Sequence, residues 1–231
     1  MEPLTGALII QQDYFEQNLD VNIKNLSSSI QIMGQQLCSS PTIGFLLNYN
    51  FNKSFDSIFE NIIIDIEQNY TSNNSDESNS IKLDRMINLA RDRGSTVYTS
   101  SKFSNNICII VSKNQSAFSD NDTTNLLNIH ERRNFIEIIC VENFTEIYKI
   151  MNKLFTNYSY KETKKIQTLL SFTDKTFDSE IHQLASLIGA YRLIDSNYVL
   201  RRHPMEWFDN YNLFSEFTNL ISVVGSKVNN L

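Results

Sequence analysis

Glycine is scarce in this sequence, with only six among 231 residues. Neither G-x-G-x-x-G nor G-x-x-x-x-G-K-[ST] occurs in it. Both patterns need glycine because a side chain there would keep backbone N–H groups from approaching a phosphate. The scarcity therefore argues against a dinucleotide-dependent enzyme and against a P-loop ATPase.

Cysteine and histidine are also sparse, with three of each. Cys38, Cys108 and Cys140 show no C-x-x-C spacing, and the last two lie in apolar runs that are typical of buried free thiols. The histidines stand at no metal-ligand spacing: His130, His182 and His203. We interpret the second as a packing residue on a helix. The sequence thus predicts no metal site, no catalytic triad and no cofactor.

Long apolar runs are absent, since no stretch approaches the length of a membrane span. The first residues, MEPLTGALIIQQDYFEQ, show neither a cationic leader nor a cleavable apolar segment. The net charge of −6 excludes a protein that is cationic overall and binds nucleic acid by bulk attraction. We therefore expect an intracellular, reduced protein without membrane contact.

Short apolar runs alternate with helical periodicity in the first two thirds of the chain. We expect strands at residues 42–50, 95–100, 105–113 and 135–141. Helices are expected at residues 54–70, 81–94, 122–133 and 142–158. Gly94 is placed to stop the second of these helices, and Asn143 to cap the last. Strands that alternate with helices imply parallel pairing and an α/β layer architecture.

The two flanks of this region predict helices only. Spaced apolar positions in residues 7–38 indicate one or two helices, and strand signals vanish after residue 160. Helices are expected there at residues 161–171, 177–188, 190–201 and 204–222. We therefore divide the chain into a helical segment 1–40, an α/β domain 41–158 with a polar, disordered insertion 71–80, and an all-α domain 161–231.

The stretch LRRHPMEW, residues 200–207, has the features of a recognition corner. Arg201 and Arg202 end one expected helix, and Pro204 opens another, where a proline is well tolerated. After residue 160 the charge is balanced, with eight basic and eight acidic residues, so local phosphate contact is permitted. Beyond the proline the aromatic density exceeds the need of a small helical core, which indicates a partner surface.

The segment FTDKTFDSEIHQLASLIGAYRLIDSNYVLRRHPMEWFDNYNLFSEFTNLI resembles a tandem helix-hairpin-helix module. The preceding TIGFLLNYNFNKSFDSIFENI, NICIIVSK and FIEIICVENFTEIYKIMNKL look like the strand–helix series of the XPF-type nuclease fold. This order is similar to the family of non-catalytic XPF partners, and most of all to its meiotic yeast branch. Like that family, the chain lacks the G-D…E-R-K nuclease motif, because Glu131-Arg132-Arg133 ends a helix and no Gly-Asp pair precedes it.

This resemblance implies an inactive nuclease-like α/β domain with helices on both faces of its sheet, followed by the tandem hairpin domain. It implies a non-enzymatic subunit of an XPF-like heterodimer that binds branched DNA and promotes meiotic crossover formation and chromosome synapsis. The protein would lie in the nucleus on chromosomes, with no cofactor and no small-molecule substrate.

The expected hairpins at residues 173–176 and 201–205 lack the usual glycine, so side chains would have to contact the phosphates. Asp174 argues against such contact in the first hairpin. The candidate DNA contacts are Lys161, Lys164, Lys165, Arg192, Arg201 and Arg202. The candidate partner interface is Trp207, Phe208, Tyr211, Phe214 and Phe217.

Two alternatives stay open. The net charge and the glycine-free hairpins also suit a protein-binding adaptor of an intracellular assembly with no nucleic-acid role. An enzyme of unrecognised class is the third reading, although the sequence shows no catalytic constellation for it.

Overall fold

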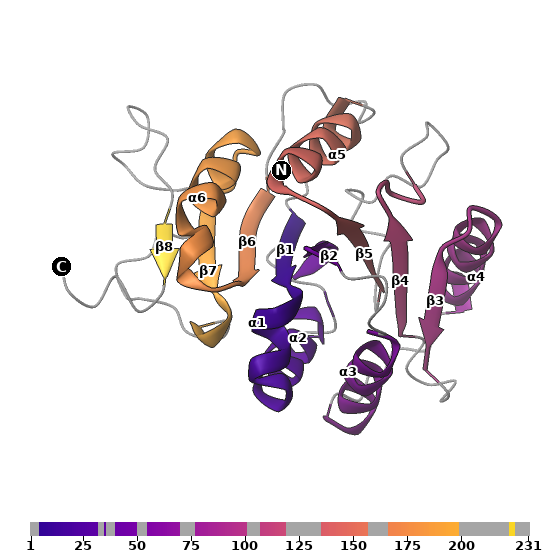
Figure 1. The fold of residues 1–231 in the computed structure, drawn as a ribbon. Coiled ribbons are helices and arrows are strands. Elements are labelled where there is room, and N and C mark those ends of the chain that lie inside the picture. Colours follow the sequence, from indigo (N-terminus) through magenta and orange to yellow (C-terminus); the bar gives the residue numbers. More distant parts are fainter. Residues whose placement is uncertain are drawn as a thin grey trace, which may run out of the picture.

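The computed structural model describes residues 5–31, 35, 40–49, 55–69, 77–100, 107–118, 135–156, 166–198 and 222–224. They contain one eight-stranded sheet of order β3-β4-β5-β2-β1-β6-β7-β8, shown in Figure 1. Every neighbouring pair is parallel except the pair of β3 and β4 at one edge. The sheet runs across both expected domain boundaries.

The strands are β1 (Thr5–Gln11), β2 (Pro41–Leu47), β3 (Thr96–Thr99), β4 (Cys108–Lys113), β5 (Phe135–Val141), β6 (Ile166–Phe172), β7 (Arg192–Asp195) and β8 (Ser222–Val224). The helices are α1 (Gln12–Gln17), α2 (Leu19–Gln31), α3 (Asp56–Asn69), α4 (Glu77–Asp92), α5 (Phe144–Thr156) and α6 (Asp178–Leu187). Two short 3₁₀ turns, η3 (Lys175–Phe177) and η4 (Ser196–Tyr198), follow β6 and β7.

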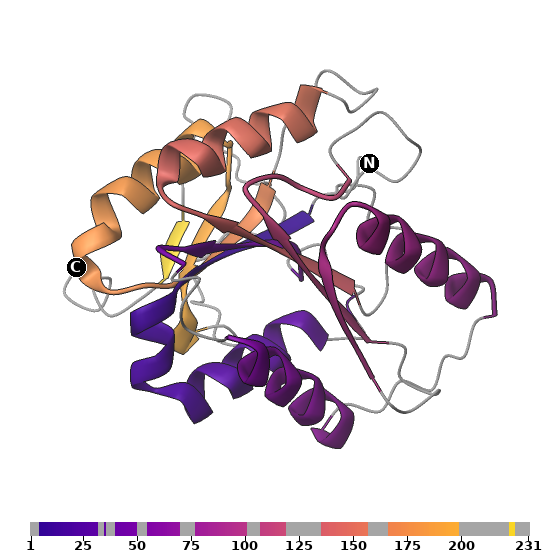
Figure 2. The ribbon, with the colours of Figure 1, turned by 45° about the vertical axis from the view of Figure 1, so that its right-hand side comes forward.

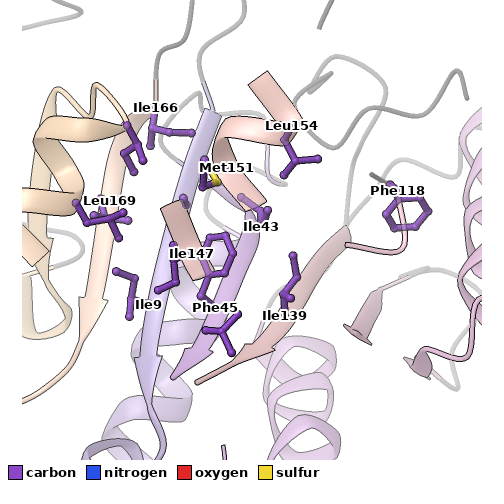
Figure 3. Close-up of a cluster of buried hydrophobic side chains, with 14 of the residues drawn as sticks. Ile9, Ile43, Phe45, Phe118, Ile139, Ile147, Met151, Leu154, Ile166 and Leu169 are labelled. Carbon is purple, nitrogen blue, oxygen red and sulfur yellow. The ribbon is translucent and has the colours of Figure 1, made fainter. Parts of the chain in front are cut away.

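The helices form one layer on each face of the sheet (Figure 2). Helices α1, α2 and α3 pack on one face, and α4, α5 and α6 pack on the other. Strand β1 serves both cores, because its side chains alternate: Ala7 and Ile9 face α4–α6, whereas Leu8 and Ile10 face α1–α3. In Figure 3 the side chains of Ile147 and Met151 from α5 lie over the sheet beside those from β1 and β2.

The α/β class and the helices on both faces are confirmed. Strands β3, β4 and β5 fall within the expected ranges, as do α3 and α5, and β2 begins one residue before its expected range. Gly94 ends its helix as expected: it has a positive φ of 78°, and the next residue, Ser95, donates its N–H to the carbonyl of Ala90 at 2.9 Å. Asn143 accepts a bond from the N–H of Glu146 at 3.1 Å, as a helix cap does. Helix α4 begins at Glu77, inside the expected insertion 71–80.

The all-helical flanks are wrong. Residues 5–11 form the central strand of the sheet, and residues 166–172 form β6 beside it. Residues 192–195 form β7, within the expected helix 190–201. No tandem helix-hairpin-helix domain therefore exists in the described part of 161–231, where three parallel strands join the sheet.

The cause of this error is visible in β6. Its apolar residues Ile166, Leu169 and Leu170 recur at helical spacing, but all seven residues of the strand are buried. A short apolar run covered on both faces cannot be told from a buried helix by periodicity alone. The neighbouring strand β1 decides between them by pairing in parallel register, from Gly6 with Thr168 to Ile10 with Phe172.

One buried carboxylate organises the segment after β4. Glu137, in the middle of β5, is fully buried and points to the α4–α6 face. It accepts bonds from Ser112 Oγ at 2.5 Å, Ser116 Oγ at 2.7 Å and the N–H of Ala117 at 2.6 Å. Phe118 then packs edge-on against Phe135, with ring centroids 5.7 Å apart. Glu137 thus holds the chain after β4 back against the sheet.

Truncating this carboxylate should be costly, because Glu137→Ala leaves three buried donors without their acceptor. We expect a loss of about 2–5 kcal/mol in the free energy of unfolding, measured by urea denaturation. Glu137→Gln retains one acceptor oxygen and should lose less. Equal stability of the alanine variant and the wild type would refute the role of Glu137 in holding this segment.

Gly44 in β2 is needed because the neighbouring strands approach it closely. A Cβ there would lie 2.6 Å from Leu8 Cδ1 and 3.1 Å from Leu8 Cγ. We expect Gly44→Ala to destabilise the protein by about 1–3 kcal/mol in urea denaturation. Leu8→Ala alone should also destabilise the protein, because it truncates a fully buried side chain. The double variant should lose less than the sum of the two single losses, since the smaller side chain makes room for the methyl group. Simple additivity of the two substitutions would contradict the close approach.

Candidate functional site at the carboxyl ends of β1 and β6

The chain leaves the two central strands in opposite directions. After β1 it enters α1 and α2 on one face, and after β6 it enters η3 and α6 on the other face. β1 and β6 are adjacent and parallel, so their carboxyl ends lie side by side (Figure 1). In open α/β sheets, ligands bind in the crevice at such a topological switch point. The fold therefore directs attention to Gln11 and Asp174, which stand at these two strand ends.

Gln11 and Asp174 form a reciprocal pair across the switch point. Gln11 Nε2 donates to Asp174 Oδ2 at 3.0 Å, and the N–H of Asp174 donates to Gln11 Oε1 at 3.0 Å. The amide of Gln11 thereby continues the β1–β6 ladder beyond the last pair, Ile10 and Phe172. We call this pair the Gln11–Asp174 clamp. It joins residues 163 positions apart.

The clamp carboxylate is ionised. Asp174 Oδ1 accepts the hydroxyl of Thr176 and also its backbone N–H, the latter at 2.8 Å. The hydroxyl of Thr176, then Gln11, then the backbone N–H of Thr176 lower the pKa of Asp174 below its ordinary value of 3.8. Hydrogen bonds to a carboxylate favour its charged form. Asp174 is half-buried, so this negative charge remains open to a ligand.

Further polar groups line the neighbouring strand ends. Ser171 and Thr173 share a bond between their hydroxyls at 2.7 Å. Asp195, which ends β7 and pairs with Ser171 in the sheet, accepts the backbone N–H of Asn197 at 2.8 Å and its side-chain amide at 2.9 Å. The polar groups at the switch point thus continue across the carboxyl ends of β6 and β7.

The carboxyl edge is acidic in the part of the chain that the structure describes. Acids that end a parallel strand, follow it directly or lie in the first turn of the next helix are Asp13, Asp56, Glu142, Glu146, Asp174, Asp178, Glu180 and Asp195. The bases in the same positions are Lys113 and Lys175. This balance favours neutral or cationic ligands over phosphates.

Neither described thiol has the properties of a nucleophile. Cys108 and Cys140 are buried free cysteines, as expected from their apolar runs. Burial raises the pKa of each thiol to about 12, against a small opposing effect of Arg91 on the first and Lys113 on the second. Both therefore stay protonated at neutral pH, whereas the thiolate is the reactive form.

Two tyrosines, Tyr98 and Tyr49, interact with Asp56 at the start of α3. The hydroxyl of Tyr98, in β3, donates to Asp56 at the start of α3. Burial and this bond raise the pKa of Tyr98, and burial, then Cys140 and Asp56, raise the pKa of Tyr49. The neutral phenol of Tyr98 ties the edge strand β3 to the start of α3.

Of the candidate DNA-contact and partner-interface residues, the structure describes Arg192 alone, so whether these residues lie together is not tested. Arg192 is half-buried at the start of β7, opposite Thr168, and not on a helix. His182 is exposed on α6, so its expected packing role is wrong. The other proposed DNA contacts, Lys161, Lys164, Lys165, Arg201 and Arg202, lie outside the described residues, as do Trp207, Phe208, Tyr211, Phe214 and Phe217. Their individual contacts stay untested.

Gln11 was missed because no sequence motif marks it. Asp174 was assigned to a helical hairpin, whereas it follows a strand and caps η3. The described residues contain no group of three or more His, Cys, Asp or Glu that could hold a metal ion. Within the same residues, no helix is both long and apolar enough to cross a membrane.

The ionised clamp should give the fold a measurable pH dependence. Because the folded-state pKa of Asp174 is lowered, its stabilisation is present above the ordinary value of 3.8 and is lost as the pH falls through the folded-state pKa. We expect the stability difference between wild type and Asp174→Asn, measured by urea denaturation, to shrink as the pH falls below 4. A constant difference from pH 7 to pH 3 would contradict an ionised clamp.

No family model and no curated protein sequence matches the chain. Its fold is similar to aldehyde dehydrogenases of known structure. Aldehyde dehydrogenase 21 from Physcomitrella patens, solved with the reaction product succinate, is 14% identical with a TM-score of 0.55 over 86% of this chain and 39% of that one. Glyceraldehyde-3-phosphate dehydrogenase GapN from Methanocaldococcus jannaschii, solved with NADP, is 14% identical with a TM-score of 0.55 over 86% of this chain and 41% of that one. The NAD-dependent benzaldehyde dehydrogenase from Corynebacterium glutamicum is 11% identical with a TM-score of 0.52 over 85% of this chain and 41% of that one.

The chain therefore spans about two fifths of the length of these dehydrogenases, and at such identity the likeness shows the fold alone. It overturns the resemblance to the XPF-partner family, because these fold neighbours are dehydrogenases and not XPF-like nucleases. The expected function as a non-enzymatic, DNA-binding subunit in meiotic crossover formation and synapsis is wrong for the same reason. The chain has an enzyme-like α/β fold of the kind found in aldehyde dehydrogenases.

Proposed function

We propose that this chain is a small-molecule-binding domain, and that it binds a neutral or positively charged polar ligand at the carboxyl ends of β1 and β6. The observation that carries the proposal is the Gln11–Asp174 clamp at the topological switch point. The general position of ligands in open α/β sheets supports the location. The likeness to aldehyde dehydrogenases supports a domain of an oxidising enzyme, and it makes small carbonyl compounds the first ligand class to test.

The clamp can donate and accept bonds to such a ligand. Each oxygen of a carboxylate has two acceptor positions, and Asp174 Oδ2 uses one of them for Gln11. The second can take an N–H or O–H group of a ligand. The nearby hydroxyls of Ser171 and Thr173 add donors and acceptors at the same end of β6. The negative charge of Asp174 adds attraction for a cationic group.

A dinucleotide does not fit this switch point. Strand β1 ends at Gln11 and is followed by Gln12 and Asp13, with no glycine that would let the backbone approach a pyrophosphate. Gln12 is buried, and its side-chain amide donates to Glu16 of the same helix, α1, at 3.1 Å, so this side chain is held by α1. Asp13 and Asp174 would repel the phosphates. Several fold neighbours were solved with NAD or NADP, but we assign no step at this site to either.

A charge series of aldehydes tests the proposal. Betaine aldehyde is cationic, benzaldehyde is neutral and succinate semialdehyde is anionic, and each can be titrated into ¹⁵N-labelled full-length chain. We expect the cationic or neutral compound to shift the amide signals of Gln11, Thr173 and Asp174, with dissociation constants at least tenfold lower than for the anionic one. NAD should leave these signals unchanged.

Asp174→Asn should remove the preference for the cationic compound, because it removes the charge but keeps the shape of the side chain. Asp92→Asn is the matched control, since Asp92 is exposed at the end of α4, beside the β3 edge. This control changes the net charge equally and should bind as the wild type does. Shifts confined to another part of the sheet, or a preference that Asp174→Asn leaves intact, would overturn the proposal.

A further inference from the structure

The protein itself fills most of the hydrogen-bond acceptor positions of Asp174. An ionised carboxylate has about four such positions, two on each oxygen. Thr176 fills both positions of Oδ1, one with its hydroxyl and one with its backbone N–H at 2.8 Å. Gln11 Nε2 fills one position of Oδ2 at 3.0 Å. Within the part of the chain that the structure describes, one position of Oδ2 therefore remains for a ligand.

Both oxygens of Asp174 are tied to the protein by these bonds. Thr176 lies in η3, the turn that Asp174 caps. Gln11 ends β1 and is buried, and its Oε1 accepts the backbone N–H of Asp174 at 3.0 Å. The carboxylate cannot turn to present Oδ1 to a ligand without breaking the bonds from Thr176 and Gln11. A ligand therefore meets a carboxylate that offers Oδ2 alone.

This arrangement distinguishes between cations that carboxylates commonly bind. A guanidinium has two parallel N–H groups, which pair best with both oxygens of one carboxylate. That bidentate pair cannot form here, because Oδ1 is filled by Thr176. An ammonium is a compact charge with rotatable N–H donors, so a single acceptor position suits it. A quaternary ammonium has no N–H group and gains charge attraction alone.

We infer that the ligand of this site has a primary or secondary ammonium group that donates one hydrogen bond to Asp174 Oδ2, and that Thr176 determines this specificity by filling Oδ1. The inference rests on the proposed function, because it takes the Gln11–Asp174 clamp as the binding site. It adds the chemical class of the cation and a residue that selects it. Thr176 is exposed, so its side chain can be changed without disturbing either core.

Three cations that share a butyl chain test this specificity: butylammonium, butylguanidinium and butyltrimethylammonium. Each is titrated near neutral pH into ¹⁵N-labelled full-length chain, and the amide signals of Gln11 and Asp174 are followed. We expect the dissociation constant of butylammonium to be about tenfold lower than that of butyltrimethylammonium, because only the former adds a charge-assisted hydrogen bond. Butylguanidinium should bind no more tightly than butylammonium.

Thr176→Val removes the hydroxyl from Oδ1, so that each oxygen of Asp174 can accept one N–H of a guanidinium. We expect the dissociation constant of butylguanidinium to fall about tenfold, and that of butylammonium to change by less than about threefold. Asp174 stays ionised near neutral pH in this variant, because loss of the bond raises its pKa only toward the ordinary value of 3.8. Thr176→Ser is the matched control: it keeps the hydroxyl and should keep the wild-type order of affinities.

The outcomes separate this inference from the proposed function. The inference alone is overturned if benzaldehyde shifts the signals of Gln11 and Asp174 but none of the cations does. It is also overturned if butylguanidinium or butyltrimethylammonium binds the wild type more tightly than butylammonium, or if Thr176→Val leaves the ratio of the butylguanidinium and butylammonium dissociation constants unchanged. If neither benzaldehyde nor any of the cations shifts these signals, the proposed function fails as well.

Discussion

The parallel pairing of β1 with both β2 and β6 is the constraint on which the rest of the structure depends. β1 is a seven-residue strand near the start of the described chain, yet it lies in the middle of the sheet. Its register holds residues 41–47 on one side and residues 166–172 on the other. Because its alternating side chains enter both cores, each helix layer rests on this strand. Parallel strands with both faces covered need crossovers, which the helices supply.

The same pairing creates the candidate site. The crossovers of these adjacent strands go to opposite faces, which is where open α/β sheets bind ligands, and the Gln11–Asp174 clamp lies at these carboxyl ends. Its chemistry is that of an amide and an ionised carboxylate among other acids. The fold alone is compatible with many activities, so the argument for a ligand rests on this site and not on the likeness to dehydrogenases. Residues that a pyrophosphate site needs do not follow β1.

The sequence predicts those parts of the fold in which local signals agree. Strand β5 is an apolar run interrupted by Glu137 alone, and α5 combines a cap at Asn143 with apolar residues at helical spacing. Strands β1 and β6 carry no such agreement, since TGALIIQ and IQTLLSF are each short enough to belong to a buried helix. Only their pairing with partners distant in sequence settles them. Once 166–172 and 192–195 are strands, the helical hairpins disappear, and the family resemblance disappears with them.

The site was less predictable than the fold for a related reason. Gln11 and Asp174 are common polar residues that lie far apart in sequence, and their pairing follows only from the strand order. Glu137 shows the same limit, because a lone acid within FIEIICV gives no hint of its three partners, one in β4 and two on the segment after it. Local patterns report secondary structure, whereas sites in such folds are assembled by topology.

Native-state hydrogen exchange tests most directly whether one sheet, centred on β1, holds the described chain together. Exchange of the amides of Leu8 and Ile10 in β1 and of Leu169 and Leu170 in β6 would be followed in increasing urea. The account predicts that all four report the same opening free energy and the same dependence on urea. Lower opening free energies and a weaker urea dependence for β6 than for β1 would mean that residues 166–198 open as a separate unit, and would contradict it.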